Sequence, residues 1–288
     1  MPGLVVDGVQ MTETDANYQS TIKYLTVPPA NQNDPAFNGT DIAAIKALED
    51  PVRREIYDAM NGSTETFSFD NRDSAVIHWD FRIGTIQAMT SMNAGAINYN
   101  YWNPSENIPV TPPGPLWTKG TAPRTFLFRS APGSKSSDAV VQLVTGAARG
   151  ECLGAINAAY LIGERNAVSA DDFDQRHPAG SLNLAGLGIF QAASDTNTVI
   201  PGDYRYFKNK DDYLEQCRAR RRTNAMWQGE NVVYIGGGKY SGLGLDAKTE
   251  DELRDDMQRA YELDMRTTFT GNPTTQIRFT RLDRPQVD

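Results

Sequence analysis

Cysteine and histidine are both scarce in this chain of 288 residues, with two of each. Two cysteines are too few for a disulfide framework, so they favour a reducing compartment or a free catalytic thiol. The acidic run at residues 171–174 lacks the glycine and glutamate spacing of a calcium-binding EF-hand loop. We therefore expect no metal and no cofactor.

Positive charge and long apolar runs are also lacking. The formal net charge is −8, which argues against a nucleic-acid-binding surface. The one basic run, at residues 218–222, lies among acidic residues and is typical of a solvated face or of a contact with an acidic partner. No apolar run approaches the ~20 residues of a membrane span, and the N-terminus lacks the features of a signal peptide. We expect a protein made in the cytoplasm that binds neither nucleic acid nor membrane.

What the chain does have is helical patterns followed by strand patterns, which predict an α+β fold. Residues 1–40 are rich in turn formers, above all at residues 28–35, so we expect an extended arm or a lid there. Helical spacing or capping signals mark residues 41–46, 50–62, 74–93, 136–145 and 249–265. Strand-like runs occupy residues 125–128, 203–207, 231–235, 239–245 and 276–281.

Cys152 is the first candidate for chemistry because it stands where a helix would begin, at the head of the apolar stretch 151–162. The helix predicted at residues 136–145 would lead straight into it. Backbone N–H groups and the positive end of the helix dipole stabilise a thiolate at such a position, which makes the cysteine a nucleophile. The alternative is a buried structural cysteine. Cys217 has basic neighbours but no partner motif, so we expect no catalytic role for it.

Glu230 lies in Trp227-Gln228-Gly229-Glu230-Asn231, directly before a strand-like run. A glutamate in water is a weak base for a thiol, since their reference pKa values differ by ~4 units. Burial beside Trp227 would raise the pKa of the carboxyl group, and the helix terminus would lower that of the thiol. A cysteine at a helix start that faces an acid on a neighbouring strand is the plan of papain-like acyltransferases, so the pair predicts thioester chemistry. Taken alone, Glu230 would be a surface acid at the edge of a hairpin.

Further residues complete the candidate site. Glu151 is a second carboxylate that could assist the reaction or only complement the helix dipole. His78 is expected in the core or on the surface of an early helix, and His177 in a loop, where it is the next candidate for the base. The candidates for an apolar wall that binds substrate and keeps water from a thioester are Trp227, Tyr160 and Tyr240.

Several blocks of the sequence follow one another in a recognisable order, at residues 151–152, 202–209, 227–232, 239–240, 242–244 and 281–285. They read Glu-Cys, Gly-Asp-x-x-Tyr-Phe-Lys-Asn, Trp-x-Gly-Glu-Asn-Val, Lys-Tyr, Gly-Leu-Gly and Arg-Leu-Asp-x-Pro. In this the chain resembles the spore-coat protein-glutamine γ-glutamyltransferases of endospore-forming bacteria. The resemblance extends over roughly residues 75–285 and is weak before that. The family has a histidine shortly before its Gly-Leu-Gly, where this chain has Lys239-Tyr240-Ser241.

The resemblance implies a papain-like or NlpC-like transglutaminase domain at residues 71–288, with the nucleophile at a helix N-terminus packed on an antiparallel sheet. Residues 1–70 would then form an N-terminal arm and helices, and possibly a lid. Carried over to this chain, Cys152 is the nucleophile, Glu230 the paired base and Glu151 an assisting carboxylate. The implied activity is cross-linking of proteins that carry glutamine and lysine, through an isopeptide bond. The implied location is a spore coat or, for an exported effector, another cell.

Two alternatives stay open at this point. If water reaches the thioester before an amine does, the same site is a protein glutamine deamidase. The chain could also be an inactive relative that serves as an interaction module, although it keeps both Cys152 and Glu230. Neither the protein substrate nor the oligomeric state follows from the sequence.

Overall fold

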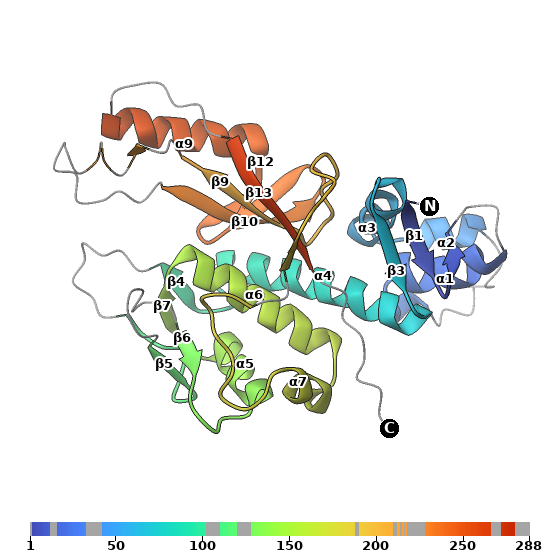
Figure 1. Ribbon diagram of the computed structural model, residues 1–288, viewed down its shortest axis with the longest axis horizontal. Coiled ribbons are helices and arrows are strands. Elements are labelled where there is room, and N and C mark those ends of the chain that lie inside the picture. Colours follow the sequence, from blue (N-terminus) through green and yellow to red (C-terminus); the bar gives the residue numbers. More distant parts are fainter. Residues whose placement is uncertain are drawn as a thin grey trace.

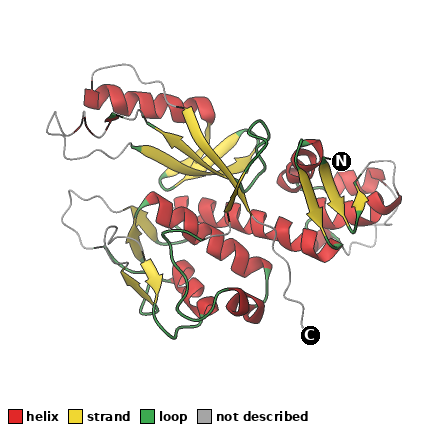
Figure 2. Cartoon of the chain, viewed as in Figure 1, coloured by secondary structure: helices red, strands yellow, loops and turns green. Residues whose placement is uncertain are grey.

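The computed structural model describes residues 2–11, 16–32, 42–101, 110–119, 128–187, 190–209, 212, 213, 215, 217, 228–265 and 272–279. Helices and strands both occur throughout these ranges (Figure 2), which confirms the predicted α+β class. An N-terminal module lies at one end of the long helix α4 (Arg72–Asn93), and the rest of the chain builds a sheet with helices on both faces (Figure 1).

The N-terminal module, residues 2–69 within the described ranges, combines a small sheet with helices. Its elements are β1 (Gly3–Val6), β2 (Val9–Gln10), α1 (Ala16–Thr26), a 3-10 turn (Pro29–Asn31), α2 (Ile42–Leu48), α3 (Pro51–Gly62) and β3 (Thr66–Phe69). The sheet has the order β2-β1-β3, with β1 antiparallel to β2 and parallel to β3. The turn at Asp7-Gly8 joins the first two strands, and both residues have positive φ, as a tight hairpin requires.

Residues 2–11 and 16–32 are folded rather than extended. Leu4 on β1 and Leu25 on α1 are fully buried in a hydrophobic cluster with Ile56 of α3 and Trp79 of α4. The prediction of an extended arm is therefore wrong for these residues, because their apolar side chains supply one side of a core. Residues 33–40, the rest of the expected arm, lie outside the described residues.

Helix α3 begins where its sequence indicates. Asp50 is the N-cap, and its carboxylate accepts hydrogen bonds from the N–H groups of Val52 and Arg53 at 3.0 and 2.9 Å. Pro51 occupies the first turn, where its missing N–H costs nothing. The predicted helix start at Asp50-Pro51 is confirmed.

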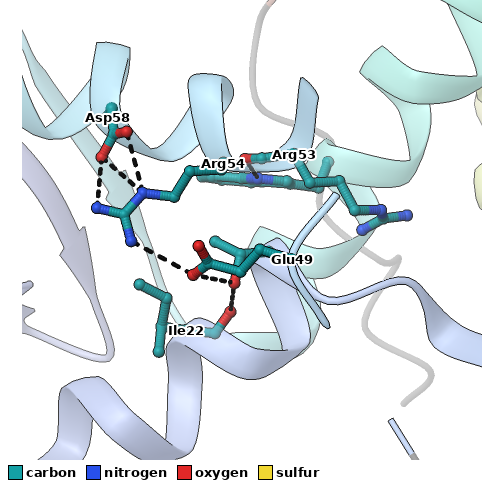
Figure 3. Close-up of polar contacts among 7 residues, drawn as sticks. Ile22, Glu49, Arg53, Arg54 and Asp58 are labelled. Atoms are coloured by element: carbon teal, nitrogen blue, oxygen red, sulfur yellow. Dashed lines mark hydrogen bonds and ion pairs between the residues drawn. The ribbon is translucent and has the colours of Figure 1, made fainter. Parts of the chain in front are cut away.

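A polar network links α3 and the residue before its N-cap to the end of α1 (Figure 3). Arg54 of α3 lies between Glu49 and Asp58, at 3.3 and 2.8 Å. Glu49 also accepts a hydrogen bond from the hydroxyl of Thr26, at the end of α1, at 3.1 Å. These contacts hold the two helices together beside their apolar interface.

Helices α4 and α6 (Cys152–Ala167) lie side by side in the middle of the molecule (Figure 1). A Cβ on Gly84 of α4 would lie 3.0 Å from the Cα of Gly163 of α6. The two backbones therefore approach more closely there than larger residues would allow. The helix predicted at residues 74–93 is confirmed as most of α4.

The main sheet is antiparallel throughout, in the order β12-β11-β10-β9-β13-β8. Its strands are β8 (Phe190–Ala192), β9 (Tyr204–Lys208), β10 (Gly229–Gly236), β11 (Lys239–Gly242), β12 (Leu245–Thr249) and β13 (Asn272–Phe279). Helix α9 (Glu250–Met265) covers one face of the sheet, and α4 and α6 cover the other (Figure 1). The capping box predicted at residues 249–252 is confirmed, since Thr249 and Glu252 exchange hydrogen bonds at 2.8 and 3.2 Å.

Strand alternation decides which residues of β10 reach α6. Val233 belongs to the hydrophobic cluster of α4 and α6, whereas Val232 and Tyr234 belong to the cluster beneath α9 with Leu253. Successive side chains of a strand point to opposite faces. The odd-numbered residues in this part of β10 therefore face α6, and the even-numbered ones face α9.

A short strand separates the helix before Cys152 from α6. The elements in this region are β4 (Tyr99–Tyr101), β5 (Trp117–Lys119), β6 (Phe128–Ser130), α5 (Ser136–Thr145), β7 (Ala148–Gly150) and α7 (Ala170–Arg176). Strand β7 pairs in parallel with β4, which places Tyr101 beside Gly150. The prediction that α5 leads straight into α6 is wrong, because β7 intervenes. None of the helices in the described ranges has the length and apolar character of a membrane span.

Candidate active site

Cys152 is the first residue of α6, and Glu151 is its N-cap with an extended backbone. Cys152 as a whole is partly exposed, although burial is the largest influence on its thiol. The N–H of Leu153, which has no partner within the helix because it lies in the first turn, donates a hydrogen bond to the sulfur. The sequence correctly indicated a helix that begins at this cysteine.

The side chain that contacts the sulfur is an amide rather than a carboxylate. Nδ2 of Asn231 donates a hydrogen bond to Sγ of Cys152 at 3.0 Å. Oδ1 of the same amide accepts one from the hydroxyl of Tyr204 at 2.6 Å. Neither Asn231 nor Tyr204 was among the residues predicted from the sequence. Strand alternation was the available signal, since it requires that either Glu230 or Asn231 face the helix.

By strand alternation, the side chain of Glu230 points to the face of β10 opposite Asn231. Val232 and Phe207, the cross-strand partner of Glu230, lie on that same face. Among the described residues Glu230 makes no hydrogen bond to Cys152. Its negative charge nevertheless raises the pKa of both Cys152 and Tyr101, so the carboxylate lies within electrostatic reach of the thiol. Glu151 raises the pKa of Cys152 in the same way, with a smaller effect. The structure thus places Glu151 and Cys152 at the start of α6, with Glu230 within electrostatic reach of the thiol.

The pKa values of this group confirm one half of the sequence-based expectation and contradict the other. Burial raises the pKa of Glu230 to about 8. Burial, followed by the charge of Glu230, raises the pKa of Cys152 to about 11, although Asn231 and the N–H of Leu153 act in the opposite direction. The helix start therefore does not lower the thiol pKa below its ordinary value, because loss of solvent outweighs it. The two pKa values still differ by only about 3 units, against ~4 for the free side chains.

Tyrosines of β4 line the other side of the thiol. Burial and then the charge of Glu151 raise the pKa of Tyr99 well above its ordinary range. Its hydroxyl occupies the space where Gly150 lacks a side chain, since a Cβ there would lie 2.3 Å from it. Burial and then the charge of Cys152 raise the pKa of Tyr101 to about 12. Both phenols therefore stay protonated near neutral pH and keep their O–H donors.

The candidates for a substrate wall are not where the sequence suggested. Tyr160 is fully buried, and its hydroxyl donates to the carbonyl of Gly202 at 2.8 Å. Tyr240 is buried on the α9 side of the sheet, where its hydroxyl accepts a hydrogen bond from Arg205 at 2.7 Å. Neither side chain lines the way to the thiol, which corrects the expectation. Trp227 lies outside the described residues.

His177 lies far from the thiol. Its Nε2 is 2.8 Å from Glu164, which lies twelve residues after Cys152 on α6 and hence about 18 Å along the helix axis. It is therefore not an alternative base in this structure. His78 is buried, and its Nε2 accepts a hydrogen bond from Arg82 at 2.8 Å.

Cys217 is fully buried in the cluster beneath α9, on the face of the sheet away from Cys152. Within the part of the chain that the structure describes, no group of three or more histidine, cysteine or acidic side chains is arranged to hold a metal ion. The chemistry available at the site is therefore that of a thiol, two carboxyl groups, an amide and phenols.

The chain is similar to known protein-glutamine gamma-glutamyltransferases. Residues 33–286 match the family model described as protein-glutamine gamma-glutamyltransferase. A curated relative, the protein-glutamine gamma-glutamyltransferase of Bacillus pumilus (strain SAFR-032), is 29% identical over 117 residues, which cover 38% of this chain and 42% of that protein. The alignment thus spans less than half the length of that relative. A solved structure, the transglutaminase from Geobacillus stearothermophilus without its C-terminal extension, gives a TM-score of 0.49 at 20% identity, with coverage of 74% of this chain and 100% of that one.

A thiol at a helix start with carboxyl groups beside it is the kind of site that cysteine acyltransferases use. Because the family model matches most of its length, the chain belongs to the protein-glutamine gamma-glutamyltransferase family.

Proposed function

We propose that this protein is a protein-glutamine γ-glutamyltransferase in which Cys152 is the nucleophile and Glu230 the general base. The observation that carries the proposal is the position of the Cys152 sulfur in a chain of this family. The sulfur lies at a helix start and accepts hydrogen bonds from Nδ2 of Asn231 and the N–H of Leu153. The charges of Glu230 and Glu151 act on it. The proposed substrates are proteins that carry glutamine and lysine side chains.

The first step transfers the thiol proton. Carboxylate Glu230 accepts the proton of Cys152, which leaves a thiolate and a neutral carboxylic acid. The net charge of the pair stays at −1, so the buried site never holds two negative charges on these groups. A gap of about 3 pKa units sets an upper bound of about 4 kcal/mol on the cost of this transfer. The true cost is smaller, because the charge of Glu230 that raises the thiol pKa disappears when Glu230 accepts the proton.

The second step forms the thioester. The thiolate attacks the carbonyl carbon of the glutamine carboxamide, and the oxygen of the tetrahedral intermediate becomes negative. The N–H of Cys152, in the first turn of α6, is suited to stabilise this oxyanion. Neutral Glu230 then gives its proton to the leaving nitrogen, ammonia departs, and a γ-glutamyl thioester and a carboxylate remain.

The third step passes the acyl group on. A deprotonated lysine amine attacks the thioester, and Glu230 accepts the proton that the new amide nitrogen loses. The departing thiolate takes that proton back, so Cys152 and Glu230 return to their starting states. We assign to Glu151, the N-cap residue, an assisting role in these proton transfers, because its charge also acts on the thiol.

We further propose that α6 and the antiparallel strands β9 to β11 correspond to the core of a papain-like fold. The packing of α6 against β10 supports this, since it brings the nucleophile to the sheet that carries Glu230. Trp227 directly precedes the Gln228-Gly229-Glu230 segment. We propose that Trp227 keeps water from the thioester. The spore-coat location stays a prediction from the resemblance.

Partial exposure of Cys152 favours one second candidate, a protein glutamine deamidase. Water that reaches the thioester would hydrolyse it to glutamate with the same residues. Mass spectrometry of a glutamine-rich unfolded protein, incubated with and without a primary amine, separates the two activities. Amine adducts identify the transferase, and glutamate formed in the presence of amine identifies the deamidase. Neither product should form with Cys152→Ala, and if wild-type protein leaves every glutamine unchanged, the proposed function is wrong.

A further inference from the structure

We infer that Asn231 is a catalytic residue that stabilises the Cys152 thiolate, and that Tyr204 is a positioning residue that fixes the orientation of the Asn231 amide. The inference rests on the proposed function insofar as it assigns Cys152 as the nucleophile. It adds the groups that hold the sulfur in the form that reacts.

The contacts of the Asn231 side chain fix the orientation of its amide. An asparagine can present either Oδ1 or Nδ2 to the sulfur, and only Nδ2 can donate to a negative charge. The hydroxyl of Tyr204 has one proton, which it donates to Oδ1 at 2.6 Å. This contact turns Oδ1 away from Cys152 and leaves Nδ2 facing the sulfur at 3.0 Å. Burial raises the pKa of Tyr204 well above its ordinary range, so the phenol keeps that proton.

The hydrogen bonds to the sulfur decide which group can accept the thiol proton. Nδ2 of Asn231 is a donor and cannot accept a proton from Cys152. The sulfur already accepts from Asn231 and from the N–H of Leu153, so its own proton is left for a carboxylate. When Glu230 takes that proton, both donors stay in place and become charge-assisted, which strengthens them. The amide therefore favours thiolate formation without taking part in proton transfer.

Tyr204 is itself held in place by its neighbours. The preceding residue, Asp203, is fully buried and forms an ion pair with the equally buried Arg82 of α4 at 2.9 Å. The ring of Tyr204 packs on Phe190, with ring centroids 5.9 Å apart, and Tyr160 packs on Phe190 from α6 at 4.7 Å. Strand β9 and the phenol are thus held from both central helices. A fixed phenol can fix an amide, whereas a mobile one could not.

The test measures the acidity of Cys152 directly. Tyr204→Phe removes the hydroxyl and keeps the ring, so we expect alkylation by iodoacetamide near pH 8 to slow about three- to tenfold. Asn231→Ala removes the donor itself and should slow alkylation by about tenfold or more, as the thiol pKa rises by about one unit. Alkylation of the Cys152 peptide is followed by mass spectrometry over a range of pH, so that a shifted profile is distinguished from a loss of access. Cys217 is fully buried, and its protection from label verifies that each variant is folded.

Tyr206→Phe is the matched control. Tyr206 is the direct cross-strand neighbour of Asn231, but its hydroxyl donates to the carbonyl of Gln228 at 3.3 Å rather than to the amide. The same loss of a hydroxyl, on the same strand, should leave the alkylation profile of Cys152 unchanged.

Each outcome decides one claim. If Asn231→Ala alkylates with the wild-type pH profile, Asn231 does not stabilise the thiolate. If Tyr204→Phe behaves like Tyr206→Phe, Tyr204 has no positioning role. Alkylation requires no glutamine substrate, so shifted profiles in a protein that releases no ammonia from glutamine would refute the proposed function and uphold this inference. Ammonia release with unshifted profiles would do the reverse.

Discussion

Replacing Glu230 by glutamine should make the protein more stable at alkaline pH and less active at the same time. Glutamine keeps the size of the side chain but can neither ionise nor accept the thiol proton. Burial raises the pKa of Glu230 to about 8, against ~4.3 in an unfolded chain. The folded state therefore binds this proton more tightly, and wild-type stability falls as the pH rises through the window between the two values.

The size of the effect follows from the width of that window. One pKa unit corresponds to about 1.4 kcal/mol, so a shift of about 3.5 units makes the ionised carboxyl cost at most about 5 kcal/mol above pH 8. Part of this cost is already present near pH 5. The difference in free energy of unfolding between Glu230→Gln and wild type should therefore widen by up to about 4 kcal/mol from about pH 5 to about pH 9. Any constant offset between an acid and an amide cancels in this comparison.

Urea unfolding of both proteins across this pH range measures the difference. Glu215→Gln, at an exposed position, is the control for loss of a negative charge and should follow wild type at every pH. Parallel stability curves for Glu230→Gln and wild type would refute the reasoning, because they would mean that Glu230 ionises in the folded protein as it does in water.

The same pKa predicts the activity profile. Near neutral pH about one molecule in ten carries Glu230 as the carboxylate, so ammonia release should rise about tenfold per pH unit below 8 and level off above it. In Glu230→Gln the rise should disappear, and the rate should fall roughly 10²–10⁴-fold. If the profile of the variant still bends near pH 8, the base is another residue.

Other variants test the rest of the site. Cys152→Ala should abolish both ammonia release and amine incorporation, whereas Cys217→Ala should leave both largely intact in the same assay, because Cys217 is buried on the other face of the sheet. Glu151→Gln should slow ammonia release less than Glu230→Gln does, and equal losses would give the two carboxylates equal roles. Gly150→Ala should lower both the melting temperature and the activity, because its Cβ would lie 2.3 Å from the Tyr99 hydroxyl; wild-type values would contradict that contact. Deleting residues 1–32 should unfold the protein rather than open a lid, since they supply buried core residues, and a soluble, active deletion variant would disprove this.

A lid made by the N-terminal module is also at odds with its position. Glu55 of this module accepts hydrogen bonds from the N–H of Gly237 and the hydroxyl of Tyr234, at the end of β10 away from Asn231. Asn231 and Gly237 are six residues apart, which is about 20 Å along a strand. Within the described residues, the module therefore braces the far end of the strand that carries the site.

Local signals predicted helices well where two of them agreed. Asp50-Pro51 combines a capping side chain with a proline at N1, and residues 249–252 combine a capping box with an apolar period, and both helices begin there. The N-terminal strand β1 gave no such signal. It has four residues, and its parallel partner β3 lies about sixty residues away, so its pairing depends on contacts that no local pattern contains.

At the site, the sequence pointed to Cys152 and to the nearby carboxylates, but not to the amide that contacts the sulfur. Cys152 was predictable because helix starts have a local signature. Asn231 was not predicted, because the sequence does not show which residues of this strand face the helix. Tyr99 and Tyr101 were not considered, because only the pairing of β4 with β7 brings them to the thiol.

Gly229 fixes the register of β10, and with it which residues of the strand face α6. A Cβ at this position would lie 2.2 Å from the hydroxyl of Tyr206 and 2.6 Å from the carbonyl of Phe207, so only glycine fits opposite β9 in the observed register. Slipping the strand by one residue would place a side chain in that space and would also turn every following side chain to the other face. Glu230 would then face α6, and Asn231 would face α9. The glycine of the Gly-Glu-Asn motif thus selects the amide, rather than the carboxylate, as the side chain that contacts the sulfur.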